Sequence, residues 1–590
     1  MPVRSIDKSE RELIAAVDRV RLVEWNRRLV REVRLSGSAE EARAFDEVQA
    51  ELERLGFTTK RMSTDAYISL PIRASLEVNG EAVDCITHSM SASVQDLQAS
   101  LVDLAPLPPD RWSADILAGR VGLTDGLAVP GLVVRAMECG AAGMVFVNGD
   151  LTYEMIVSPV WGHPTPETLD RLPTIPVVSV TRHGGERIRE LMRGGTAECV
   201  MTTVVDTGIR PIPVLTAEIN GRETPEDFVL FSGHIDSWHY GAMDNASANA
   251  LMVEVARVVA AHRYELRRSL RLAFWSGHSH GRYAGSAWYC DTHWEELHEH
   301  CMVHINVDSV GGRGATVLSE ANAMAETKPL AAEVIEALTG QSFVGTRYGR
   351  SGDQSFWGPG VPSLFMGLSE QPASDDPAAR AFAELFGGGN TGGFGWWWHT
   401  TEDTLDKIDP DLLVRDTQIY LLVIWRFLTD PLLPITCSKA ALDVESALMR
   451  WQSRAGEHLD LSEAIRRARE LTQRLRAIDA QMPDLQDPAA RETCNRLIMR
   501  MCRLLVPLNY VKGSPFDHDL ALSQSPLPKL ADIDRLAAEA PGTLRHRALQ
   551  TALRRRSNEV CHTLKEAIRL ADEWSDVLTN ARRQEEGASE

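Results

Sequence analysis

The chain has 590 residues, of which 44% are hydrophobic and 24% are charged; this composition is typical of soluble globular proteins, and the length is too great for a single hydrophobic core. Its formal net charge of −20 argues against nucleic acid as a partner, because binding to phosphates needs basic surface patches. The apolar runs are short and the start of the chain lacks the apolar segment of a signal peptide, so we expect no membrane span and a cytoplasmic location. Nine scattered cysteines without a CxxC pair suit a reducing compartment.

The N-terminal part, residues 1–64, is predicted to be helical. Residues 7–57 carry the pattern of two helices. In the second, Ser38 and Glu41 form a capping box and Gly56 ends the helix. We interpret these helices as packing elements of a catalytic core.

Residues 65–205 change character and predict a separate β-rich domain. Short β-branched runs alternate with turns, as in Gly143-Met-Val-Phe-Val and Ile175-Pro-Val-Val-Ser-Val. A helix is expected between such runs, over Val133–Gly140, because Gly140 closes it.

Residues 206–435 alternate strand and helix, which predicts an α/β domain with a mostly parallel sheet. The expected strands are Phe228–Ser232, Leu270–Trp275 and Met302–Val307, and a helix is expected over Asn245–His262. In such sheets ligands bind beyond the carboxyl ends of the strands. The residues that follow each strand are therefore the candidates for chemistry.

Residues 436–590 are rich in Leu, Ala, Arg and Glu and predict a helical domain without obvious chemistry. Helical periods recur in Ala440–Ala455, Leu461–Ile478, Arg491–Leu505 and Leu544–Asp576.

Imidazoles and carboxylates follow the strands of the α/β region. His234 and Asp236 come after the first strand and point to the same side if the segment is extended, which suits a metal-bound imidazole oriented by a carboxylate. Asp244 opens the next helix, Asp308 follows a later strand, and His399 follows a glycine-rich stretch. Each alone fits an N-cap or a loop residue. Together they predict a site for a divalent metal ion at one edge of the sheet.

The chain resembles the zinc exopeptidase family that includes leucyl aminopeptidases, glutamate carboxypeptidase II, glutaminyl cyclases and transferrin receptor. The matching stretches are Gly233-His-Ile-Asp-Ser-Trp, Gly241-Ala-Met-Asp-Asn-Ala, Arg268-Ser-Leu-Arg-Leu-Ala-Phe-Trp, Gly285-Ser-Ala-Trp-Tyr, Ile305-Asn-Val-Asp-Ser-Val-Gly, Ser351-Gly-Asp-Gln-Ser-Phe and His399-Thr-Thr-Glu-Asp.

The resemblance implies roles for single residues. His234, Asp244, Asp308 and His399 match metal ligands, with Asp244 as the bridging carboxylate, and Asp236 matches the residue that orients a ligand. Residues 65–205 resemble a protease-associated insert domain. Residues 436–590 resemble a dimerisation domain, so a homodimer is expected.

One departure from the family concerns the catalytic centre. The family has Gly-Glu-Glu-x-Gly, in which the first Glu is the general base and the second a metal ligand, whereas this chain has Gly277-His278-Ser279-His280-Gly281. His278 could replace the base, because imidazole titrates near neutral pH. Alternatively, His278 or His280 could bind the metal, or the second metal site could be empty.

These residues predict a metal-dependent hydrolase that acts on an amide or peptide-like C–N bond of a small molecule or short peptide. One or two divalent ions are expected, with zinc preferred over iron, manganese, copper or nickel. Trp398, Trp357 and Arg350 are candidates for substrate contacts. The alternatives are a non-peptidase reaction on the same scaffold, such as cyclisation, deamination or carbon–heteroatom cleavage, and a receptor-like binding protein without catalysis.

Overall fold

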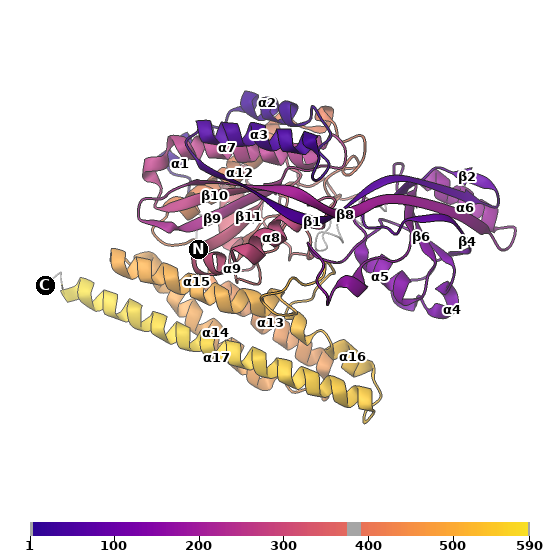
Figure 1. Cartoon of the computed structure of the whole chain (residues 1–590). Coiled ribbons are helices and arrows are strands. Elements are labelled where there is room, and N and C mark those ends of the chain that lie inside the picture. Colours follow the sequence, from indigo (N-terminus) through magenta and orange to yellow (C-terminus); the bar gives the residue numbers. More distant parts are fainter. Residues whose placement is uncertain (1–3, 375–390, 588–590) are drawn as a thin grey trace.

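The computed structural model describes residues 4–374 and 391–587 (Figure 1). An α/β domain, a β-rich insert and a bundle of C-terminal helices lie in three regions of the molecule. Among the described residues, no helix combines the length and the apolar character that crossing a membrane requires. All nine cysteines are free thiols.

The core of the α/β domain is built on six strands of a 12-stranded sheet. Its strands are β1 Thr58–Val78, β8 Glu198–Ile219, β9 Thr224–His234, β10 Arg268–Trp275, β11 Cys301–Asn306 and β12 Ser363–Leu364. The order in space is β12-β11-β9-β10-β8, and the first four run parallel. β8 pairs antiparallel with β10 and β1 antiparallel with β8. The mostly parallel α/β sheet predicted from the sequence is thus confirmed.

Helices cover both faces of this sheet (Figure 1). One face carries α1, α2, α3, α7 and α12, and α8 and α9 lie against the other. The helices of the core are α1 Lys8–Ala15, α2 Arg19–Leu29, α3 Ala39–Arg54, α7 Ala248–Ala261, α8 Ala284–Thr292, α9 Trp294–His300, α10 Lys328–Thr339 and α12 Pro410–Thr429. α7 is almost entirely buried between α2, α12 and the sheet, which explains why both of its faces are apolar.

The N-terminal segment forms three helices where the sequence pattern predicted two. The break falls at Asp18, whose carboxylate accepts the backbone N–H groups of Val20 and Arg21 and so starts a new helix. Ser38 caps α3 as expected, but Glu41 accepts the N–H of Gly37 and not that of Ser38.

The insert shares the sheet but has a hydrophobic core of its own. Its elements are β2 Glu81–Val83, β3 Ile86–Thr87, β4 Val94–Asp103, β5 Val121–Asp125, β6 Gly143–Val147, β7 Val177–Val180, α4 Ala114–Leu117, α5 Pro130–Glu138 and α6 Arg182–Met192. The long strands β1 and β8 pair from Thr58 and Glu218 in the core to Val78 and Cys199 in the insert. The boundaries expected at residues 65 and 205 therefore lie inside a continuous two-stranded ribbon.

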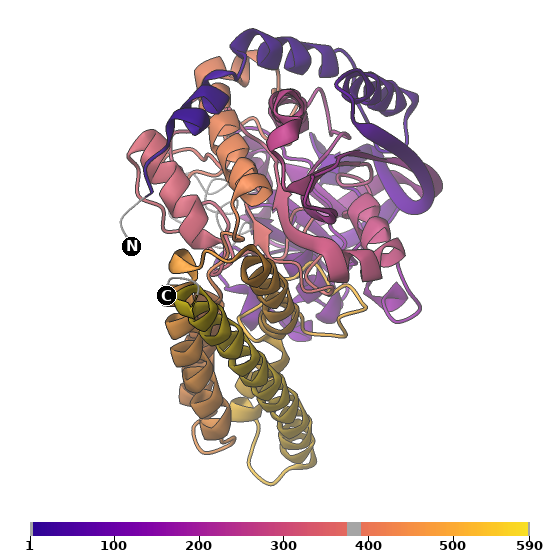
Figure 2. The same cartoon turned by 90° about the vertical axis from the view of Figure 1, so that its left-hand side faces the viewer.

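The C-terminal helices form a bundle on the side of the sheet that carries α9 (Figures 1 and 2). They are α13 Cys437–Ala455, α14 Ser462–Gln481, α15 Pro488–Tyr510, α16 Ile533–Ala538 and α17 Leu544–Gly587. Arg503 on α15 fastens the bundle to the core, because its guanidinium donates to the carbonyls of Leu297, Cys301 and Gly360.

Candidate metal centre

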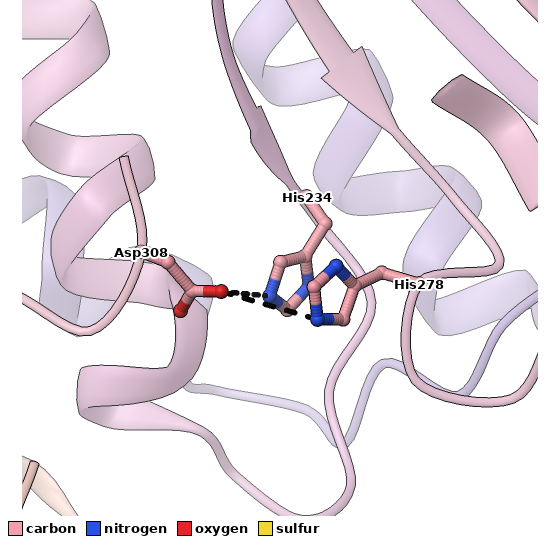
Figure 3. A group of neighbouring side chains, drawn as sticks. All are labelled: His234, His278 and Asp308. Atoms are coloured by element: carbon pink, nitrogen blue, oxygen red, sulfur yellow. Dashed lines mark ion pairs between the residues drawn. The ribbon is translucent and has the colours of Figure 1, made fainter. Parts of the chain in front are cut away.

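The carboxyl ends of the parallel strands bring the predicted chemical groups together. β9 ends at His234, the loop after β10 carries His278, and Asp308 lies two residues beyond the end of β11. One imidazole nitrogen or carboxylate oxygen from each of these three residues lies within 4.8 Å of the others. Figure 3 shows both imidazole rings facing the carboxylate of Asp308.

His234 is buried with its Nε2 atom facing two carboxylates. The Nε2 atom lies 3.1 Å from Oδ1 of Asp244 and 3.5 Å from Oδ2 of Asp308. Its Nδ1 atom lies 2.9 Å from the backbone carbonyl of Asp236, which can only accept, so Nδ1 carries a proton. When its Nε2 atom carries no proton, His234 therefore presents the lone pair of that atom to two negative groups.

The same atoms lack hydrogen-bond partners. Within the described part of the chain, Nε2 of His234 and Oδ1 of Asp244 are buried without one. Donor atoms bound to one tetrahedral ion lie about 3.3 Å apart, given bonds of ~2.0 Å. The observed separations match that value. Buried nitrogen and oxygen atoms that lack hydrogen-bond partners and lie at this spacing fit the ligands of a divalent cation.

The electrostatic field at His234 favours positive charge. Burial by itself lowers the pKa of His234, but the carboxylates of Asp308, Asp236 and Asp244 outweigh it and raise that pKa well above its usual value. Both a proton on Nε2 and a metal ion beside it would supply the positive charge that these carboxylates favour.

Asp244 lies in an irregular turn that precedes α7. The turn spans Ala242–Ser247, and the carboxylate of Asp403 holds it by accepting the N–H groups of Met243 (2.8 Å) and Asp244 (3.0 Å). Gly241 has a φ of +56°, and a Cβ there would lie 2.1 Å from the Asp244 carbonyl oxygen, so only glycine fits. Burial raises the pKa of Asp403 to about 7, although both hydrogen bonds oppose the shift.

Asp403 was not identified as a site residue from the sequence, although it stands four residues after His399. A general rule could have indicated such a residue, because the free N–H groups at the start of a helix or turn need an acceptor. The sequence does not say which distant side chain supplies it.

His399 extends the cluster on the far side of Asp244. Its Nε2 atom lies 3.0 Å from Oδ2 of Asp244 and accepts the indole N–H of Trp238 at 3.2 Å. Its Nδ1 donates to the carbonyl of Glu154 in the insert at 2.6 Å. The carboxylate of Asp244 thus lies between two imidazoles, and the insert supplies one of the contacts that orient His399.

Asp236 holds the site from beneath. Its Oδ1 lies 3.4 Å from Nδ1 of His234, and its Oδ2 accepts the Ser36 hydroxyl (2.6 Å) and the N–H of Ser279 (2.8 Å). Burial alone would raise the pKa of Asp236, but the contact with His234 and the neighbouring imidazoles lower it overall. The carboxylate contacts both His234 and the loop that bears His278.

His278 and His280 face different surroundings. His278 stacks on His234 with ring centroids 3.7 Å apart and planes 9° apart, and its Nε2 lies 3.9 Å from Oδ2 of Asp308. His280 is turned away: its Nδ1 lies 2.9 Å from the Ser36 hydroxyl, and burial lowers its pKa to about 4. The structure therefore does not bring His280 to the cluster as a ligand. His278 and His280 are two residues apart, but the chain turns tightly at Ser279, so their side chains point to different sides.

The hydroxyl of Ser279 lies beside the cluster. This hydroxyl is buried and, within the described residues, has no hydrogen-bond partner. A neutral hydroxyl adds no negative charge. On the side of the cluster where Ser279 lies, only Asp244 and His399 are therefore strong metal ligands.

Of the three predicted substrate contacts, only Trp398 lines the pocket over the cluster. Its ring stacks on His399. Arg350 is buried elsewhere, donating to the carbonyls of Gln354 and Asp519, with its guanidinium 3.9 Å above the ring of Trp161. Trp357 packs beside Arg350 and donates to Ser363. Arg350 and Trp357 therefore hold the fold together and do not reach the pocket, which corrects the expectation from the sequence.

Comparisons with known proteins agree with this fold. Residues 215–424 match the family model described as peptidase family M28. The central domain has the M28 peptidase fold. A zinc aminopeptidase from Bacillus subtilis superimposes with a TM-score of 0.53 at 18% identity, covering 70% of this chain and 96% of that structure.

Two sequence relatives align over shorter segments. A probable glutamate carboxypeptidase, VP8 of Zea mays, is 33% identical over 93 residues, which are 15% of this chain and 13% of that protein. Aminopeptidase NAALADL1 of Rattus norvegicus is 30% identical over 125 residues, which are 20% of this chain and 16% of that protein. The aligned segments thus span less than a fifth of these relatives.

Proposed function

We propose that the chain is a metal-dependent hydrolase that cleaves an amide or peptide-like C–N bond of a small substrate. The observation that carries the proposal is the pair of buried, unpartnered atoms, Nε2 of His234 and Oδ1 of Asp244, at ligand spacing. The M28 match over residues 215–424 and the zinc aminopeptidase fold support the reaction class.

His234, Asp244 and Asp308 would hold one divalent ion, and zinc suits their nitrogen and oxygen donors. When bound, such an ion polarises the substrate carbonyl and lowers the pKa of a water molecule towards neutrality. A second ion is not part of the proposal, because Asp244 and His399 alone offer too few donors once Ser279 stands in place of a carboxylate.

His278 would act as the general base. An imidazole lone pair lies in the plane of its ring, and the stacked rings of His234 and His278 direct their Nε2 lone pairs side by side without convergence. This arrangement favours a base next to the ligand set over a fourth ligand. Nε2 of His278 would accept a proton from water as the C–O bond forms and return it to the leaving nitrogen as the C–N bond breaks.

The pocket favours an apolar group on the substrate. Its described lining includes Met155, Ile156, Met366, Phe394 and Trp398. Arg282 also lines it, and two of its guanidinium nitrogens donate to the carbonyls of Ser158 and Ile156. The apolar side chains of the lining support an apolar acyl or side-chain group on the substrate.

Metal analysis combined with a substrate panel tests the function. The purified protein should bind about one zinc ion per chain and, loaded, hydrolyse some members of a panel of short peptides and N-acyl amides. If the loaded protein catalyses cyclisation or deamination and no hydrolysis, the proposed reaction class is wrong. Protein that neither contains nor takes up a divalent ion would support a binding protein without catalysis.

We also propose that the insert acts as a protease-associated domain, that the C-terminal helices hold a homodimer and that the protein resides in the cytoplasm. Exposed Met449 on α13 and Leu544 on α17 offer apolar surface for such an interface, and nine free thiols suit a reducing compartment. Sedimentation velocity at micromolar concentration should give a dimer, and Met449→Glu with Leu544→Glu should shift it to a monomer. A monomeric parent protein would contradict the assembly.

A further inference from the structure

Asp353 is a buried carboxylate that touches the other nitrogen of His278. Its Oδ2 lies 2.8 Å from Nδ1 of His278, and its Oδ1 accepts the hydroxyl of Ser286 at 2.7 Å. Asp353 belongs to the Ser351–Phe356 stretch, to which no chemical role was assigned from the sequence pattern. It lies on the side of the ring opposite the cluster, so it is not itself a ligand candidate.

The hydrogen bonds behind Asp353 have a fixed direction. The indole N–H of Trp161 can only donate, and it donates to the Ser355 hydroxyl at 2.9 Å. Ser355 lies 2.9 Å from the Ser286 hydroxyl, whose own proton goes to Asp353 at 2.7 Å. Asp353 is the shorter of the two contacts open to that proton, because the carbonyl of Tyr283 lies at 3.2 Å. Ser355 therefore donates to Ser286, and the chain runs from Trp161 to Asp353.

As a carboxylate, Asp353 only accepts hydrogen bonds, at Oδ1 from Ser286 and at Oδ2 from His278. The contact with His278 then requires a proton on Nδ1, which leaves the lone pair on Nε2, the atom that faces Asp308. Stacking on His234 and an edge contact with Tyr283 at 4.8 Å hold the ring plane. One group fixes the tautomer and two rings fix the orientation.

We infer that Asp353 is the positioning residue of a His278–Asp353 dyad that takes over the work of a single catalytic carboxylate. The inference rests on the proposed function, because it assumes that His278 is the base. Asp353 holds Nε2 free to accept the proton of water and stabilises the imidazolium that forms, while it keeps no proton itself. The proton then passes from Nε2 to the leaving nitrogen.

The first test reads the tautomer and does not depend on activity. NMR spectra are recorded on zinc-loaded protein with ¹⁵N-labelled histidine, at a pH where the ring is neutral. The His278 signal is assigned as the one that disappears in His278→Asn, and it should show a protonated Nδ1. Asp353→Asn should change that signal, since an amide can donate to Nδ1. A His278 signal that is protonated at Nε2 in the parent protein would overturn the inference.

The second test is a double-mutant cycle on hydrolysis. Asp353→Asn should lower kcat by about 10²–10⁴-fold with bound zinc and KM little changed. In a His278→Glu background the sign should reverse, because the introduced carboxylate and that of Asp353 would repel each other, and Asp353→Asn removes the repulsion. An equal loss in both backgrounds would mean that Asp353 has a structural role only, and the inference fails.

A second Asp–His pair in the same domain provides the matched control. Asp227 lies 3.2 Å from Nδ1 of His300, near the start of β9 and so at the other end of the strands. Asp227→Asn should leave kcat and the His278 signal unchanged. If the parent protein binds zinc but hydrolyses nothing while the His278 tautomer is as expected, the proposed function and the catalytic part of the dyad fail, and only the hydrogen bond by which Asp353 fixes the tautomer of His278 stands.

Discussion

The two halves of the candidate metal centre share Asp244 but differ in what surrounds it. On one side, His234 and Asp308 converge with Asp244 at 3.1–3.5 Å from the His234 nitrogen. On the other, His399 contacts Asp244 and Trp238, and the neighbouring Ser279 contributes a neutral, unpartnered hydroxyl. The first half has three nitrogen and oxygen donors, whereas the second has two and a neutral hydroxyl. This difference is the basis of the proposal that one ion binds in the first half, with His278 beside it.

Removing the shared carboxylate should have the largest effect. Asp244→Ala takes a donor from both halves and leaves His399 and His234 facing an empty space, so bound zinc and hydrolysis should both fall below detection. Elemental analysis and the substrate panel measure the two losses, and circular dichroism checks the fold. Asp65→Asn, an exposed change on β1, is the control. Normal zinc content in Asp244→Ala would remove the basis for the comparison.

Truncating His278 should separate base from ligand. His278→Ala should keep the zinc, because the lone pair of the stacked ring runs beside that of His234 and does not converge with it, and should lower kcat by about 10²–10⁴-fold. Zinc content and kcat are measured on the same preparation. Loss of zinc in parallel with activity would make His278 a fourth ligand of the first half.

Weakening the support of Asp244 should have a smaller effect. Asp403→Asn leaves one acceptor oxygen for the N–H groups of Met243 and Asp244, so the turn that aims the Asp244 carboxylate loosens. Zinc affinity should fall about 10–100-fold, measured by competition with a chelator. Glu402→Gln, an exposed neighbour, should leave the affinity unchanged. Unaltered affinity in Asp403→Asn would show that the turn holds without this acceptor.

The sequence predicted the sheet, and it predicted His234 and Asp308 at the sheet edge because strand ends are visible as apolar runs followed by polar groups. Asp244 and His399 lie outside strand ends, and their motifs resembled those of a known family. The sequence did not predict which way side chains turn in loops. His280 and His278 are two residues apart, yet one contacts Ser36 and the other Asp353.

Contacts between distant segments were equally hidden. Arg350 was interpreted as a substrate contact, although its partners are carbonyls at positions 354 and 519. Glu154 of the insert, whose carbonyl orients His399, carries no motif at all. Such roles depend on backbone atoms and on long-range packing, which local sequence patterns do not encode.

Introducing a carboxylate at Ser279 should have the smallest effect on the native reaction and sharpens the comparison most directly. Ser279→Glu adds a negative donor beside Asp244 and His399, so the second half should gain enough ligands to bind an ion. The zinc content, measured by elemental analysis, should then rise from about one to about two ions per chain. Ser279→Gln has nearly the same size without the charge and should stay at about one, which separates ligand chemistry from crowding. A parent protein that already holds two ions would contradict the single-ion centre, whereas a Ser279→Glu variant that still holds one would place the limit at His399, whose Nε2 already accepts the Trp238 indole N–H.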